Sequence, residues 1–146
     1  MRTFFLIIAL FALSFKFSMA VSQTLNIEIN NIKSSQRGVI RIAFFVNEIG
    51  YETEDASFEI RCDKSQIKDR KLNVEVPVKC GIWGISVIDD ENNSGKMEYN
   101  LLGIPKEGFG FSNYSLKKMR KPPFSDFSFA IGEKEVKNIE VKMKYL

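Results

Sequence analysis

Histidine is absent from all 146 residues of the sequence, and this absence limits the chemistry that the chain can perform. Serine and cysteine nucleophiles are commonly activated by a neighbouring histidine that takes up the proton of the hydroxyl or thiol. The sequence offers no Ser-His or Cys-His pair, so any hydrolysis would have to rely on carboxylates. We therefore expect no catalytic residue and no enzymatic activity.

An excess of charge of one sign is also missing. Lys and Arg number 21 against 18 Asp and Glu, which gives a net charge of +3. Without Arg2 and Lys16, which lie in the N-terminal segment described next, 19 basic residues face 18 acidic ones and the net charge is +1. This balance indicates neither a nucleic acid nor an acidic membrane surface as a partner. The one local basic run, LKKMRK at residues 116–121, is typical of a solvated loop.

The only long apolar run stands at the N-terminus and is short for a membrane span. Residues 1–20 combine a basic Arg2, an apolar run over residues 4–13 and a small residue at Ala20. This is the pattern of a secretory signal peptide that is cleaved after Ala20, with cleavage after Ser22 and a membrane anchor as the alternatives. We therefore expect residues 21–146 to form a single domain without a transmembrane span, in the periplasm or secreted.

Cysteine is scarce, with only Cys62 and Cys80. An even count in an oxidising compartment favours a disulfide. A bridge across this 18-residue separation would contribute about 3 kcal/mol where the geometry allows it. A pair of buried free thiols is the alternative, and a catalytic thiol would lack a histidine to activate it. We predict a structural disulfide between Cys62 and Cys80.

Helical periodicity is also missing, and alternation with a period of two dominates. Leu25, Ile27 and Ile29, for example, are separated by polar residues. Segments with this pattern or a related strand pattern are residues 24–32, 39–46, 57–62, 71–78, 80–90 and 136–146. About seven short strands separated by turns predict an all-β fold, a single immunoglobulin-like antiparallel β-sandwich.

Two residues add detail to this prediction. Pro77 cannot donate a hydrogen bond to a neighbouring strand, so segment 71–78 should end there or lie at a sheet edge. Trp83 alternates with Ile85 and Val87, which is typical of a core residue. A tryptophan that stacks on a ligand is the alternative.

What the sequence does contain is an oxygen-rich turn after segment 80–90. In DDENNSGKME, oxygen-bearing side chains stand at alternate positions and a glycine follows. Calcium takes six to eight oxygen ligands, and binding loops supply them with this spacing. The backbone carbonyl of Lys96 would be a further ligand. We predict a Ca²⁺ site formed by Asp90, Asn92, Ser94, Lys96 and Glu98.

This turn does not match an EF-hand, because Leu101 stands where the closing glutamate would be and the flanks are strand-like. Another segment must complete the ligand shell, and Asp89, Glu91 and Glu107 are the available carboxylates. So few charges predict a weak affinity. The alternative is a hairpin turn whose side chains bond only to their own backbone.

A segment rich in glycine and phenylalanine follows at residues 103–115. Proline and packed aromatic rings make such a loop rigid, while glycines let another surface approach closely. Residues 103–123 lack a clear strand pattern, and long ordered loops are often functional. A packed connection that covers the end of the sandwich is the alternative. The candidate partner-binding residues are Gly103, Pro105, Lys106, Glu107, Phe109, Phe111, Ser112 and Asn113.

Three segments resemble a known family. DENNSGKME at residues 90–98, NLLGIPKEGFGFSN at 100–113 and PPFSDFSFAI at 122–131 are similar to the exported bacterial family numbered 2141 among the domains of unknown function. The resemblance covers essentially the whole mature chain and implies a prealbumin-like, or transthyretin-like, β-sandwich. It implies no activity, because the family has none established. Ser94 and Glu98 depart from the family pattern but keep oxygen at the ligand positions.

These features lead to one main hypothesis and two alternatives. The main hypothesis is a non-enzymatic binding or structural module of the bacterial cell envelope. Calcium would order its turn, and residues 103–115 would contact an unidentified protein or envelope ligand. The first alternative is a metal-assisted hydrolase that uses carboxylates such as Asp90 and Glu107. The second is a sandwich whose open edge pairs with another protein or a second copy.

Overall fold

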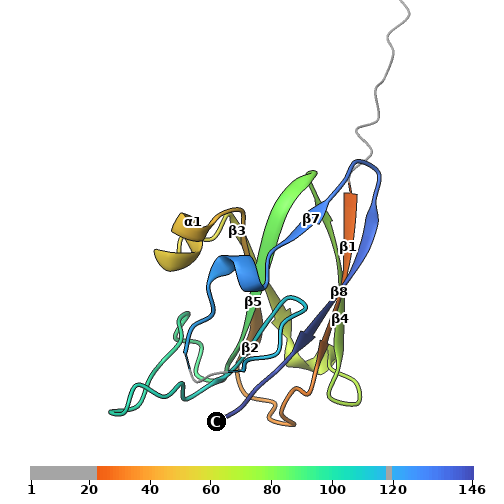
Figure 1. Cartoon of the computed structure of the whole chain (residues 1–146). Helices are drawn as coiled ribbons and strands as arrows, with labels where there is room; N and C mark the ends of the chain where they lie inside the picture. The colour runs from red at the N-terminus through yellow and green to blue at the C-terminus, as the bar shows by residue number, and fades with distance from the viewer. Residues whose placement is uncertain (1–22, 118–119) are drawn as a thin grey trace, which may run out of the picture.

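Two β-sheets pack face to face in the computed structural model, which describes residues 23–117 and 120–146 (Figure 1). The predicted signal peptide lies outside the described residues. The first sheet has the order β4-β1-β8, with β1 at Gln23–Asn30, β4 at Leu72–Val78 and β8 at Val136–Lys142. The second has the order β3-β2-β5-β6, with β2 at Val39–Phe45, β3 at Phe58–Asp63, β5 at Gly81–Asp90 and β6 at Gly108–Phe111. Its fifth strand, β7 at Phe129–Ile131, pairs with the start of β5.

In the part of the chain that the structure describes, three short helices join or cover these strands: α1 at Glu48–Glu52, η1 at Lys64–Gln66 and η2 at Phe124–Asp126. Helix α1 connects β2 to β3 and begins after Asn47, whose side chain accepts a hydrogen bond from the backbone N–H of Gly50 at 2.8 Å. Five residues are too few to show a helical period, so the sequence pattern gave no sign of it. Within the described residues, no helix has the length and apolar character needed to cross a lipid bilayer.

The predicted all-β sandwich is confirmed, but β6 and β7 were not predicted. Strand β6 lies inside the segment that was expected to be a loop. It alternates glycine with phenylalanine, so the usual apolar and polar alternation is absent. A Cβ atom on Gly108 would lie 2.2 Å from the ring of Tyr145, and one on Gly110 would lie 2.7 Å from Val141 Cγ1. The glycines therefore allow β6 to pack closely against the C-terminal strand.

The expectation of a wholly antiparallel sandwich is wrong for one pair of strands. Strand β1 pairs antiparallel with β4, but it pairs in parallel with β8, with Ile27 opposite Ile139. Antiparallel pairing is required only where a short hairpin joins two strands. Strands β1 and β8 are separated by nearly the whole chain, so no such constraint acts on them.

The main core lies between the two sheets. Its largest contributions are Leu25, Ile27 and Ile29 from β1, Ile40, Ile42 and Phe44 from β2, and Trp83, Ile85 and Val87 from β5. The core position of Trp83 is confirmed, since the side chain is buried and its Nε1–H donates to the carbonyl of Lys79 at 2.9 Å. Pro77 lies on β4 at the edge of the first sheet, as predicted.

A second apolar cluster covers the opposite, outer face of the five-stranded sheet. It consists of Phe45, Tyr51, Phe109, Phe111, Phe124 and Phe127. Alternate residues of β2 face the two clusters, with Phe44 in the main core and Phe45 in the outer one. Helices α1 and η2 contribute Tyr51 and Phe124, so they cover part of this outer face. The sheet is therefore apolar on both sides, and the candidate site lies beside the outer cluster.

The predicted disulfide is wrong, because Cys62 and Cys80 are both free. Cys62 lies opposite Ile40, which in turn lies opposite Asp89 near the end of β5. Cys80 immediately precedes the start of β5. Nine residues of extended chain span roughly 30 Å, whereas a disulfide needs Cα atoms within about 7 Å.

Candidate functional site

The oxygen-rich turn begins where β5 ends at Asp90. This side chain is fully buried, and its two carboxylate oxygens accept hydrogen bonds from the backbone N–H groups of Ser94 and Gly95, each at 2.9 Å. Asn92 Oδ1 also accepts from the Ser94 N–H at 2.9 Å, and Ser94 Oγ donates to the Lys96 carbonyl at 3.0 Å. The side chains of Asp90, Asn92 and Ser94 thus hold the turn itself together.

Arg41 approaches this turn from the outer face of β2. Its guanidinium donates to Glu59 Oε2 at 2.5 Å, and its Nη1 lies 3.8 Å from Asp90 Oδ2. A Cβ atom on Gly95 would lie 3.2 Å from Arg41 Nη1, and Gly95 has a φ of +83°. Glycine is therefore favoured at this position both by the left-handed backbone and by the nearby guanidinium.

Asp89, one of the carboxylates considered for a ligand shell, points to the other side of β5. It is fully buried, and Lys64 Nζ lies 2.5 Å from its Oδ1 as an ion pair rather than a well-aligned hydrogen bond. The hydroxyl of Tyr145 donates to Asp89 Oδ2 at 2.8 Å. Burial, with a contribution from Asp89, raises the pKa of Tyr145 well above its usual value. Asp89 is thus part of a buried structural group.

Glu107 lies in a contrasting environment. Its side chain is only 7% exposed, yet neither carboxylate oxygen makes a hydrogen bond of standard geometry. Burial raises the pKa of Glu107, and the nearby carboxylates of Asp90 and Glu98 raise it further. The backbone N–H groups of Glu91 and Glu98 partly oppose that rise. Glu91 Oε1, at the same end of the sheet, is likewise buried without a hydrogen bond of standard geometry among the described residues.

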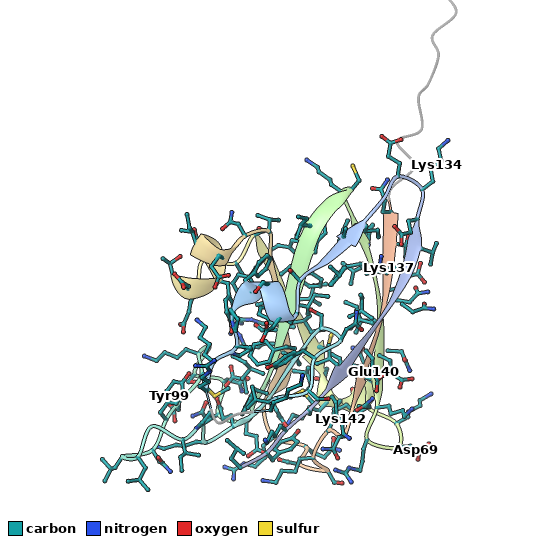
Figure 2. All side chains as sticks on the ribbon, in the orientation of Figure 1. Asp69, Tyr99, Lys134, Lys137, Glu140 and Lys142 are labelled. Atoms are coloured by element: carbon teal, nitrogen blue, oxygen red, sulfur yellow. The ribbon has the colours of Figure 1, made fainter. Side chains whose placement is uncertain are left out.

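Residues 98–106 form a projecting hairpin, which we call the finger hairpin. The N–H of Lys106 donates to the carbonyl of Glu98 at 2.9 Å, and Tyr99 pairs with Pro105 as an isolated bridge. At the tip, Asn100 Oδ1 accepts from the N–H groups of Leu102 and Ile104 at 2.9 and 3.0 Å. Figure 2 shows Tyr99 on this hairpin, far from Lys137, Glu140 and Lys142 on β8.

A pocket of about 540 Å³, which we call the outer-face pocket, lies between the finger hairpin and the outer face of β2, β5 and β6. Its floor includes Arg41, Ala43, Phe45, Ser86, Ile88, Phe109 and Phe111. Its walls include Tyr51, Lys96, Met97, Tyr99, Leu102, Ile104, Pro105, Leu116 and Lys121. Lys121 Nζ lies 4.1 Å from the centre of the Tyr51 ring and donates to the Tyr51 carbonyl at 3.0 Å. Apolar side chains from β2, α1, β5, the finger hairpin and β6 thus line one pocket, together with Met97, Leu116, Pro122 and Leu146.

A larger and more open hollow of about 760 Å³ lies on the outer face of the first sheet. Its lining consists mainly of Asn and Glu side chains, and Asn26 Nδ2 donates to Asn138 Oδ1 across it at 3.2 Å. Ligand sites are usually apolar with a few polar groups. The outer-face pocket fits that description better than the larger hollow.

The structure divides the predicted partner-binding residues into two groups. Gly103, Pro105, Phe109 and Phe111 line the outer-face pocket. The others among the described residues of this group do not, namely Lys106, Glu107, Ser112 and Asn113. Ser112 Oγ donates to the carbonyl of Phe127 at 2.7 Å and accepts from the N–H of Ile85 at 2.9 Å, and Asn113 Oδ1 accepts from the Glu140 N–H at 3.0 Å. Ser112 and Asn113 therefore hold elements together.

Sequence reasoning missed Arg41, Tyr51 and Lys121 as site residues. Arg41 carried a usable signal, because it is a charged residue inside the apolar run VIRIAFF and must point out of the core. Lys121 ends the basic run at residues 116–121, which was interpreted as a solvated loop, although Lys121 lines the pocket. Tyr51 carried no signal, since its position depends on α1. Among the described residues, no three His, Cys, Asp or Glu side chains are grouped as in a formed metal site.

Comparison with known proteins identifies one protein family. A family model described as an uncharacterised protein conserved in bacteria (DUF2141) matches residues 27–139. No match was found among curated proteins or among solved structures.

Proposed function

The chain belongs to the DUF2141 family of uncharacterised bacterial proteins, and we propose that it is a non-enzymatic binding module that holds a small amphipathic molecule in the outer-face pocket. The observation that carries this proposal is the pocket itself, enclosed between the sheet and the finger hairpin. Export to the cell envelope is part of the proposal and is supported by the signal-like pattern of residues 1–20. A prealbumin-like form of the sandwich is also part of it, supported by the family resemblance.

The size and walls of the pocket favour a small organic ligand. Its volume of about 540 Å³ falls within the range of roughly 300–1,000 Å³ that is usual for such sites. Aromatic rings from β2, β6 and α1 form one side, and Met97 with Ile104 and Pro105 of the finger hairpin forms another. A ligand with an apolar body would remove these side chains from water, at about 25 cal/mol for each Å² of apolar surface buried.

The charged side chains at the pocket favour an anionic group on the ligand. Arg41, Lys96, Arg120 and Lys121 line it, against Glu54 and Glu59. Glu59 is already paired with Arg41. Lys96 and Arg120 form no ion pair with any side chain that the structure describes. Those two side chains are the natural partners of a carboxylate, sulfonate or phosphate on the ligand.

The tip of the finger hairpin extends the apolar surface beyond the pocket. Leu102 is 83% exposed and lines the pocket rim, and its neighbour Leu101 is fully exposed. Adjacent exposed leucines on an ordered hairpin favour aggregation unless a ligand or partner covers them. Leu101 and Leu102 would contact the ligand, or the surface of a partner that carries it, as the ligand enters the pocket.

A dye titration tests the proposal. Anilinonaphthalene sulfonate, an anionic aromatic probe, should bind saturably with one site per chain, and decanoate should displace it. Ala43→Trp places an indole on the pocket floor and should abolish binding. Asn73→Trp is the matched control, because it adds the same group on the exposed face of β4, and it should leave binding unchanged.

Thermal unfolding of each variant checks that the fold is retained. Leu102→Glu provides a second variant at an exposed position, and it should weaken binding of the anionic dye by placing a negative charge at the rim. Equal dye affinity in Ala43→Trp, Leu102→Glu and the unmodified protein would overturn the proposal. Absence of saturable binding in the unmodified protein would overturn it as well.

No specific observation favours the hydrolytic alternative. Two carboxylates acting as acid and base need a shared concave site. Asp90 and Glu107 are not among the described residues that line the outer-face pocket. Asp90 is also engaged by two backbone N–H groups of its own turn.

A further inference from the structure

The tip of the finger hairpin is an uncharged apolar projection. The hairpin extends away from the two sheets, as Figure 1 shows. Leu101 and Leu102 are among the most exposed large apolar side chains that the structure describes. Residues 100–105, with the sequence NLLGIP, contain no charged side chain. Large apolar groups that lie together on a surface usually mark a site of interaction.

The backbone polar groups at this tip are bonded within the hairpin itself. Asn100 Oδ1 accepts from the N–H groups of Leu102 and Ile104. The N–H of Asn100 donates to the carbonyl of Ile104 at 2.9 Å, and the carbonyl of Asn100 accepts from the N–H of Gly103 at 3.0 Å. Backbone groups that enter lipid need such internal partners, because water is not there to replace them. The tip therefore meets a condition for entering an apolar phase.

The side chains behind the tip change in character with distance from it. Tyr99 is half-exposed and pairs with Pro105, and tyrosine is enriched at membrane–water interfaces. Lys96 and Lys106 follow, both exposed and without an ion pair to any described side chain. The one acidic residue among residues 96–106 is Glu98. Leucine, tyrosine and lysine thus follow the order of acyl chains, interface and anionic headgroups.

The length of the tip matches the depth of a shallow insertion. Two or three residues of extended chain separate the pair of Tyr99 and Pro105 from the leucines, and such a length spans roughly 7–10 Å. Amphipathic segments at membrane surfaces insert their apolar side to a depth of roughly 5–10 Å. The leucines would therefore reach the acyl chains while Tyr99 stays at the interface.

We propose that the tip of the finger hairpin docks the protein on a lipid bilayer with anionic headgroups, with Leu101 and Leu102 inserted into its surface. Lys96 and Lys106 would lie at the level of the headgroups and attract their negative charge. The balanced charge of the whole chain does not oppose this attraction, because it falls off within a Debye length and depends on local charges.

Docking in this way would place the rim of the outer-face pocket against the bilayer. Tyr99, Leu102 and Ile104 belong to the hairpin and also line the pocket. An amphipathic anion with an apolar body partitions into a bilayer, so the bilayer would be the source of the pocket ligand. This step rests on the proposed function, whereas docking itself requires only the tip.

A second copy of the chain is the other surface that would cover the leucines. A protein groove commonly offers hydrogen-bond partners to the backbone of the segment that it binds. Such a groove does not require a tip whose backbone groups are bonded internally. The closed bonding around Asn100 therefore favours lipid.

Vesicle co-sedimentation tests the proposal. The protein should bind vesicles of phosphatidylethanolamine and phosphatidylglycerol saturably, and more tightly than vesicles of zwitterionic phosphatidylcholine. Leu101→Ser should weaken binding about tenfold or more, because it removes an apolar side chain that docking buries. Ile82→Ser is the matched control, since Ile82 is 56% exposed at the start of β5, whereas the hairpin follows its end. All variants share residues 1–20, so any contribution of that segment is common to them.

Tryptophan fluorescence locates the contact. Trp83 is the only tryptophan of the sequence and is buried, so a tryptophan added at an exposed position reports on that position. With anionic vesicles, the emission of Leu101→Trp should shift to shorter wavelength and be quenched by a nitroxide-labelled lipid. Ile82→Trp should show neither effect. Unchanged unfolding temperatures would show that these surface variants retain the fold.

Several results would overturn the proposal. These are equal vesicle affinity in Leu101→Ser and the unmodified protein, equal affinity for the two kinds of vesicle, and an unchanged emission of Leu101→Trp. Light scattering that shows a dimer, lost in Leu101→Ser, without any vesicle binding would assign the tip to a second copy and overturn it as well. Dye binding without vesicle binding would overturn only the docking, and vesicle binding without dye binding only the proposed function.

Discussion

Replacing Lys64 by methionine should destabilise the protein strongly, because it breaks a buried ion pair. Lys64 is 2% exposed and Asp89 is fully buried, and their charged atoms lie 2.5 Å apart. Methionine fills much of the same volume but leaves the Asp89 carboxylate with only the hydroxyl of Tyr145 as a side-chain partner among the described residues. The loss therefore comes from an uncompensated buried charge rather than from a cavity.

The expected size follows from the degree of burial. Removing one partner of a fully buried pair costs about 3–5 kcal/mol. A domain of this size loses roughly 3–5 °C in unfolding temperature for each kcal/mol, so the midpoint should fall by roughly 10–25 °C. Lys71→Met is the matched control, since Lys71 pairs with Glu28 at 3.0 Å on the exposed surface. Such surface pairs contribute about 0–1 kcal/mol.

Urea denaturation of four proteins measures these values: the unmodified chain, Lys64→Met, Lys71→Met and the double variant Lys64→Met/Asp89→Leu. The double variant should recover most of the loss, because replacing both partners by apolar groups leaves no buried charge. A loss below about 1 kcal/mol in Lys64→Met, similar to that in Lys71→Met, would refute the reasoning. A double variant as unstable as the single one would refute it too.

Two further predictions test the packing of the outer face and the state of the cysteines. Gly84→Ala should cost about 1–3 kcal/mol in urea denaturation, because a Cβ atom there would lie 2.5 Å from the ring of Phe124; an unchanged stability would show that η2 does not pack on this face. Exposed Cys80 should react with Ellman's reagent in the folded protein, whereas buried Cys62 should react only after unfolding; a folded protein without a reactive thiol would contradict the free-cysteine assignment.

The sandwich could be predicted because most of its strands have a recognisable alternation of apolar and polar residues in the sequence. Leu25, Ile27 and Ile29 alternate with polar neighbours, and the structure buries all three between the sheets. Strand β6 could not be found in this way, since its glycines are required by Tyr145 and Val141 far along the chain. The sequence pattern of one segment does not indicate which residues will lie beside that segment in the folded protein.

The candidate site was predictable only in part for the same reason. The spacing of Asp90, Asn92 and Ser94 fits a metal loop and a hydrogen-bonded turn equally well, and only their contacts distinguish the two. The approach of Glu107 to Asp90 depends on β6 lying beside β5. The outer-face pocket required still more, because β2, α1 and the finger hairpin meet there only in the folded protein.

The central claim is that the outer-face pocket binds a ligand, and methyl NMR with decanoate tests it most directly. Decanoate should shift the methyl signals of Ile88, Met97 and Ile104, which line the pocket, and leave those of Leu72 and Val76 in the core unchanged. Shifts confined to Ile27 and Val74, which line the polar hollow on the first sheet, would contradict the account. A spectrum without any shift at saturating decanoate would contradict it as well.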